Sequence, residues 1–82
     1  MGIDKKIINL LSQIHILSFE DVSIAKKFLE YEDYESALKH LCSRIYEERV
    51  FISRETYELI KRIAEALDTE PWIWNDLEFL IM

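Results

Sequence analysis

Glycine and proline are almost absent from this chain of 82 residues, which contains only Gly2 and Pro71. Loops, turns and disordered segments depend heavily on these two residue types. Half of the residues are hydrophobic, so the chain has enough apolar surface to fold. These features predict tightly joined helices in a single domain, residues 1–82, with a core that is small because the chain is short.

Apolar residues at steps of three and four predict the first two helices. The first is expected to start at Ile3 and to end near Leu17. Ser18, followed by Asp21, has the spacing of an N-cap residue with an acid in the first helical turn. The apolar members of residues 22–29 then continue as the buried face of a second helix.

The third and fourth helices follow the same pattern. Asp33 can cap the third helix, which carries the clearest apolar stripe and is expected to run to about Arg49. Residues 50–52 are β-branched and aromatic, which predicts a short extended connection. Ser53 can cap a fourth helix, and this helix is expected to stop around Asp68-Thr69, where two poor helix formers lie.

A last short segment follows. Pro71 fits its first turn, and its apolar residues must be held by packing rather than by helix propensity. The predicted fold class is therefore all-α, a compact small bundle of four to five short helices.

The chain also lacks the sequence features of export. Its N-terminal residues mix polar with apolar side chains, unlike a signal peptide, and no apolar run approaches the roughly 18–20 residues of a membrane span. The single cysteine, Cys42, cannot form an internal disulfide, as is usual in a reducing compartment. These features predict a cytoplasmic protein.

Few residues could carry chemistry near neutral pH, namely His15, His40 and Cys42. Cys42 falls on the apolar stripe of the third helix, which favours a core position over a reactive thiol, and His40 projects about 200° away from it. Both histidines are expected at the surface or its boundary. Zinc needs three or four converging ligands, and a glycine-rich phosphate loop cannot be built from Gly2 alone. We therefore expect no enzyme, and no metal, cofactor or small-molecule site.

Charge indicates the kind of partner. Sixteen acidic residues against ten basic ones give a formal net charge of −6. This charge repels the phosphates of nucleic acids and anionic membranes, and it attracts basic protein surfaces. The sequence thus predicts a protein partner, with no direct contact to nucleic acid or membrane.

The acids gather in two places, the first of which is the junction before the third helix. Here carboxylates alternate with tyrosines, and the candidate partner-binding residues are Glu30, Tyr31, Glu32, Asp33, Tyr34 and Glu35. One interpretation is a solvated turn whose acids suit a helix N-terminus. The other is a patch in which carboxylates meet lysine and arginine of a partner while a tyrosine supplies apolar contact.

The second place is the run 63–82, which has five acids and no base. Its candidate partner-binding residues are Asp68, Glu70, Trp72 and Asp76. Trp72 and Trp74 are two residues apart and therefore lie on opposite sides of a helix, so at most one can fully face the core. The other is available to a partner.

Residues 28–42, Phe-Leu-Glu-Tyr-Glu-Asp-Tyr-Glu-Ser-Ala-Leu-Lys-His-Leu-Cys, resemble the central signature of the MafI family of bacterial immunity proteins. The resemblance continues, in order and spacing, through residues 45–48, 51–53, 55–60 and 74–77. It rests mostly on core and capping residues, so it bears on the fold more than on the binding surface. One departure is Asp33, because family members often have a glycine near this turn.

Members of this family are small helical proteins encoded beside polymorphic or contact-dependent growth inhibition toxins, which are often RNases of the EndoU type. They protect the producing cell by binding the toxin domain. The resemblance implies that this chain is an immunity protein whose partner is a cognate nuclease toxin domain. Its acidity fits this role, because a nuclease presents basic groups to phosphates.

Two other classes of protein can be weighed against this one. The alternative is a helical adaptor or regulatory module that dimerises through residues 50–52 or 72–82. A helix-turn-helix DNA binder needs a basic recognition helix, whereas residues 54–67 hold three bases and three acids. DNA binding is therefore disfavoured.

Overall fold

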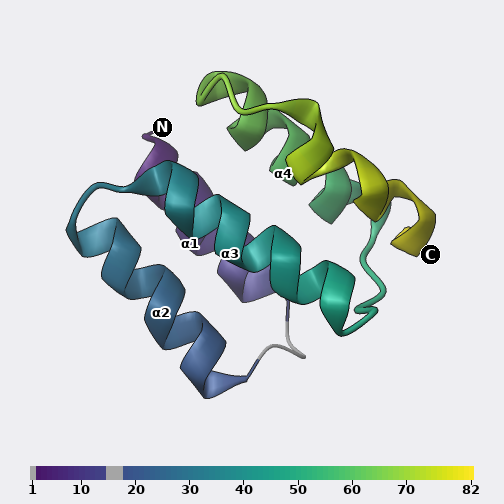
Figure 1. Cartoon of the computed structure of the whole chain (residues 1–82), viewed down its shortest axis with the longest axis horizontal. Helices are drawn as coiled ribbons and strands as arrows, with labels where there is room; N and C mark the ends of the chain where they lie inside the picture. Colours follow the sequence, from purple (N-terminus) through teal and green to yellow (C-terminus); the bar gives the residue numbers. More distant parts are fainter. Residues whose placement is uncertain (1, 15–17) are drawn as a thin grey trace.

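The computed structural model of the chain describes residues 2–14 and 18–82 and consists of helices joined by short connections (Figure 1). The elements are α1 (Ile3–Gln13), α2 (Phe19–Glu30), α3 (Tyr34–Glu47), α4 (Arg54–Ala66) and two 3₁₀ helices, η1 (Pro71–Ile73) and η2 (Asn75–Leu80). The predicted all-α small bundle is confirmed. No helix in the described ranges is long and apolar enough to span a bilayer.

Helix α3 is the central element. It contacts α1, α2, α4 and both 3₁₀ helices, and Figure 1 shows α2 on one side of it and α4 with the C-terminal segment on the other. The largest fully buried side chains come from four of these elements: Ile7, Leu10, Leu38, Leu41, Cys42, Ile45, Ile60, Ile63 and Leu77. Each buried aliphatic side chain stabilises the fold by about 1.5–3 kcal/mol.

Side-chain caps begin three of the helices, at the residues that the sequence predicts. Ser18 Oγ accepts a hydrogen bond from the Asp21 backbone N–H at 3.1 Å. Asp33 does the same for α3 at 3.2 Å and Ser53 for α4 at 3.0 Å. Each cap satisfies a backbone donor that the helix leaves without a partner, which contributes about 1 kcal/mol.

The helices end earlier than the sequence predicts. Helix α3 stops at Glu47 rather than near Arg49, and α4 stops at Ala66 rather than around Asp68-Thr69. The reason is a left-handed residue directly after each C-cap, with φ of 53° at Arg49 and 56° at Asp68. The next residue's N–H then bonds back into the helix, as Val50 does to the Ile45 carbonyl at 3.0 Å, which turns the chain away.

Helix α2 ends by the same device at Glu32, whose φ is 57°. The Asp33 N–H donates to the Phe28 carbonyl at 2.9 Å, so this junction carries both the end of α2 and the cap of α3. Helix α1 ends at Gln13, before its predicted end. Leu17 itself lies outside the described residues.

The last short segment that the sequence predicts folds as two 3₁₀ helices. Pro71 occupies the first position of η1, as predicted. Because a 3₁₀ helix has three residues per turn, Trp74, Leu77 and Leu80 fall on one side, and all three are buried. The expected extended connection is confirmed at Ile52, which forms an isolated parallel bridge with Ile81 and so ties this segment to the bundle.

Candidate functional site

The junction between α2 and α3 holds six of the predicted partner-binding residues, and the fold itself uses half of them. Asp33 caps α3, and Tyr34 is half-buried and packs against the core. Glu35 pairs with Lys39, with 2.8 Å between Oε1 and Nζ. Glu30, Tyr31 and Glu32 remain exposed, and Tyr31 exposes 76% of its surface. The solvated-turn interpretation therefore describes much of this junction.

The C-terminal run divides its two tryptophans between core and solvent, as predicted. Trp74 is 9% exposed and packs edge-on against Tyr57, whereas Trp72 is 68% exposed. The indole N–H of Trp72 donates to a carboxylate oxygen of Glu70. This hydrogen bond fixes an apolar ring beside an exposed acid, which is the kind of residue pair that protein interfaces use.

The three predicted acids of this run, Asp68, Glu70 and Asp76, are all exposed. Within the described residues, none of them forms an ion pair with a base. Asp68 lies apart from the other two in sequence, in the turn that ends α4. Trp72 is hydrogen-bonded to Glu70 and lines one pocket with Asp76, so it connects the other two acids of the predicted patch.

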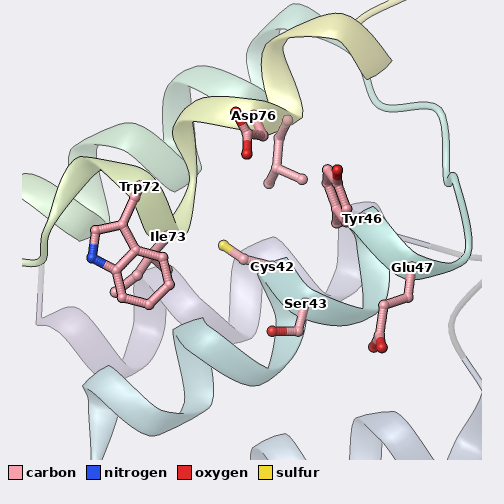
Figure 2. Close-up of a pocket in the computed structure, with 8 residues that line it drawn as sticks. Cys42, Ser43, Tyr46, Glu47, Trp72, Ile73 and Asp76 are labelled. Atoms are coloured by element: carbon pink, nitrogen blue, oxygen red, sulfur yellow. The ribbon is translucent and has the colours of Figure 1, made fainter.

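A pocket of about 440 Å³ lies between α3 and the C-terminal segment (Figure 2). Its lining residues are Cys42, Ser43, Tyr46, Glu47, Trp72, Ile73, Asp76 and Leu77. The first four come from α3 and the others from η1 and η2. Two of the predicted residues, Trp72 and Asp76, thus belong to a hollow whose other wall the sequence did not indicate.

Cys42 lies at the floor of this pocket, and its sulfur points toward the C-terminal segment in Figure 2. The residue is buried, as predicted from its place on the apolar stripe. Burial raises the pKa of the Cys42 thiol to about 12, so the thiol stays protonated at neutral pH. Cys42 therefore acts as a small apolar side chain at this position.

An aromatic cluster extends the rim of the pocket. The rings of Tyr46 and Phe79 meet edge-to-face with 6.0 Å between their centroids. The Arg49 guanidinium lies 5.0 Å from the Tyr46 centroid and 5.6 Å from that of Phe79, within cation–π range. Both rings remain exposed. We use the name pocket face for the surface formed by the pocket together with Tyr46, Arg49 and Phe79.

A polar cluster between α2 and α3 was not predicted. Asp21 is only 8% exposed and accepts hydrogen bonds from the Ser18 hydroxyl at 2.9 Å and from His40 Nε2 at 3.2 Å. Arg44 Nε also lies 3.2 Å from this carboxylate. Burial by itself raises the pKa of Asp21, but the hydrogen bonds from Ser18 and Arg44 and the charges of Arg44 and His40 outweigh burial and lower it.

This cluster joins α2 to α3. The Ser18 hydroxyl donates to Asp21, so it is not held as a nucleophile by His40. His40 is half-buried, at the boundary position expected for it, and His15 lies outside the described residues. The spacing of Ser18 and Asp21 was the available sequence signal, because an acid three residues after an N-cap can accept a hydrogen bond from the cap residue. Its contact with α3 needs the tertiary fold.

In the part of the chain that the structure describes, no three His, Cys, Asp or Glu side chains are grouped so that they could hold a metal ion. No family model, no curated protein and no solved structure matches the chain. A function must therefore be argued from the two acidic surfaces, the pocket and the residues that carry the resemblance.

Proposed function

We propose that the chain is an immunity protein that binds and neutralises a nuclease toxin domain, of the EndoU RNase type, by covering its active site or substrate groove. The observation that carries the proposal is the pairing of exposed carboxylates with an exposed tryptophan. Glu70 and Asp76 are exposed and form no ion pair with a base of the described residues, and the exposed Trp72 lies near both of them in sequence. The resemblance to the MafI family gives the class of partner.

The chemistry of a nuclease supports this pairing. An enzyme that cuts RNA presents lysine, arginine or histidine to phosphates, and its groove has a positive potential. A protein with a net charge of −6 is drawn toward that groove, which raises the rate of encounter. Buried aromatic contacts then slow dissociation, because tryptophan and tyrosine are the residues that most often carry the free energy of binding.

The direct test mixes the purified protein with the basic nuclease domain encoded immediately upstream of its gene. We expect a 1:1 complex in size-exclusion chromatography with light scattering, and loss of RNA cleavage at equimolar protein. Association should slow between 0.1 M and 1 M salt, since the screening length falls from about 10 Å to about 3 Å. Unimpaired cleavage at equimolar protein would overturn the proposal.

A second function, a helical adaptor that dimerises, is favoured by a different observation. Phe51 and Met82 are both exposed, and both line a small pocket beside the bridge between Ile52 and Ile81. A second copy could cover these side chains. The adaptor would be supported by a concentration-dependent dimer in analytical ultracentrifugation that is lost in Phe51→Ser and retained in Phe19→Ser. A protein that is still monomeric at about 100 µM would exclude it.

A further inference from the structure

We infer that the pocket between α3 and the C-terminal segment is the docking site for the partner, and that it receives an apolar side chain flanked in the partner by lysine or arginine. This inference rests on the proposed function and adds to it the surface and the chemistry of the occupant. It also chooses between the two acidic patches.

The interior of the pocket is apolar, and we therefore expect it to receive an apolar side chain of the partner. The apolar part of the lining consists of the buried Cys42 and Leu77 with the half-buried Ile73, and the Trp72 ring borders the pocket (Figure 2). The thiol is protonated, so this apolar part carries no charge. A volume of about 440 Å³ lies within the roughly 300–1,000 Å³ of ligand pockets, which is ample for one leucine, methionine or phenylalanine side chain.

The rim of the pocket is acidic, and we therefore expect lysine or arginine beside that side chain in the partner. Asp76 lies on the C-terminal wall and Glu47 on the α3 wall, and Glu70 is held beside Trp72. Glu47 is 3.3 Å from Arg44, whereas Asp76 and Glu70 pair with no base of the described residues. An apolar side chain that enters the pocket therefore brings its neighbours in the partner close to exposed carboxylates that form no ion pair, and lysine or arginine fits that position.

The pocket face is better suited to binding than the junction between α2 and α3. It presents three exposed aromatic side chains, Tyr46, Trp72 and Phe79, around a hollow. The junction presents one, Tyr31, and half of its predicted residues serve the fold. Contact residues that contribute most to binding are aromatic and sit in or against pockets, so the pocket face has the composition and the shape of such a centre.

Charge also decides against two other occupants. A second copy of this chain that pairs symmetrically through this face would bring its own Glu70 and Asp76 against these carboxylates, which repels it. A nucleic acid would place phosphates against those groups. A basic protein surface is the occupant that both the acidic rim and the apolar floor attract.

The first test uses three synthetic hexapeptides and a ¹⁵N-labelled sample of the full chain. The probe Lys-Arg-Leu-Phe-Arg-Lys carries both features, Lys-Arg-Ser-Gly-Arg-Lys lacks the apolar side chains, and Glu-Asp-Leu-Phe-Asp-Glu reverses the charge. We expect the first peptide to bind at least about tenfold more tightly than either of the others, with chemical-shift changes at Ser43, Ile73 and Leu77 and quenching of Trp72 fluorescence. Equal binding of the first two peptides, shifts centred on Tyr31, or no binding at millimolar peptide would each overturn the inference.

The second test uses matched variants. Ser43→Arg places a bulky cation at the mouth of the pocket, and Ser23→Arg adds the same group to α2, where Ser23 is exposed. Trp72→Ala removes the aromatic border, and Phe19→Ala removes an exposed ring elsewhere. We expect Ser43→Arg and Trp72→Ala to weaken binding of the first peptide about tenfold or more, and the two controls to leave it within about twofold. Circular dichroism confirms that each variant is folded.

Repeating the four variants against the upstream nuclease domain separates the two ideas. If the wild type inhibits the nuclease and Ser43→Arg inhibits it equally well, the pocket inference fails while the proposed function stands. If the wild type does not bind the nuclease, the proposed function fails, and the peptide titrations alone decide whether the pocket takes a basic, apolar partner.

Discussion

Replacing Asp21 with alanine is expected to destabilise the protein by about 2–3 kcal/mol. Asp21 is almost fully buried and accepts hydrogen bonds from Ser18, His40 and Arg44. Hydrogen bonds to charged groups contribute about 1.5–3 kcal/mol, and breaking a buried ion pair costs about 3–5 kcal/mol. We expect a value below the second range because the Arg44 side chain is 30% exposed, so water can solvate it once Asp21 is gone.

Urea unfolding followed by circular dichroism at 222 nm measures this loss. With a slope of about 1–1.5 kcal/mol/M for a chain of this size, the midpoint should fall by about 2 M. Glu20→Ala is the matched control, since Glu20 is an exposed acid in the same first turn of α2. We expect the control to lose no more than about 0.5 kcal/mol. If the stability lost in Asp21→Ala is within about 0.5 kcal/mol of the stability lost in Glu20→Ala, the reasoning is refuted.

The same pair of proteins should show a dependence on pH. The folded protein holds the pKa of Asp21 below its ordinary value, because hydrogen bonds from Ser18 and Arg44 outweigh the effect of burial. The stabilisation is therefore complete above the unfolded pKa of about 3.9 and is lost as pH falls through the folded pKa. We expect the stability difference between wild type and Asp21→Ala to be fully present at pH 5 and to shrink below about pH 4. A constant difference down to pH 2.5 or thereabouts would show that Asp21 acts only by packing.

Three further outcomes follow from the fold. Glu32→Gly should raise stability by about 0.5–1 kcal/mol in the same urea assay, because φ is 57° there. Lys26→Gly, at an exposed position inside α2, should instead lower it by about 1 kcal/mol; a loss in Glu32→Gly would contradict the left-handed cap. Leu41→Ala, at a fully buried position, should cost about 2–5 kcal/mol, and a cost under about 1 kcal/mol would place Leu41 outside the core. Cys42 should react with Ellman's reagent at pH 8 only after unfolding in urea, since burial raises its pKa to about 12; rapid reaction of the folded protein would show an open pocket floor.

The starts of the helices could be predicted and their ends could not, for a physical reason. A cap such as Ser18, Asp33 or Ser53 bonds to a backbone N–H three residues away, so the sequence contains both partners. A helix end is readable when glycine marks the left-handed residue, but here that residue is Glu32, Arg49 or Asp68. The tertiary fold imposes these turns.

Val50 illustrates how it does so. Its side chain is buried and its N–H bonds to Ile45, which is possible only if the chain reverses at Arg49. The gain from burying Val50 and closing this bond exceeds the cost of about 1–2 kcal/mol for a left-handed arginine. The sequence of residues 45–50 alone does not reveal this balance of free energies, because the gain depends on which residues surround Val50.

The two tryptophans mark a similar limit. A separation of two residues shows that only one can face the core, but it does not say which. The choice depends on the 3₁₀ geometry of the C-terminal segment, whose period of three lines up Trp74 with Leu77 and Leu80. Trp72 is left on the outside, where Glu70 holds its indole. The exposure of Trp72 on the pocket face is therefore a consequence of how residues 71–80 coil.

The two acidic patches look alike in sequence and differ in what their acids do. At the junction, Asp33 and Glu35 are engaged by a backbone N–H and by Lys39, which stabilise the folded chain. In the C-terminal segment, Glu70 and Asp76 form no ion pair with a base of the described residues, and Asp76 lines a hollow whose other wall is α3, some thirty residues earlier. Charge alone located both patches, whereas the fold separates acids that stabilise it from acids left for a partner. A binding site on this chain is therefore expected where carboxylates are free and the surface is concave, and the pocket face meets both conditions.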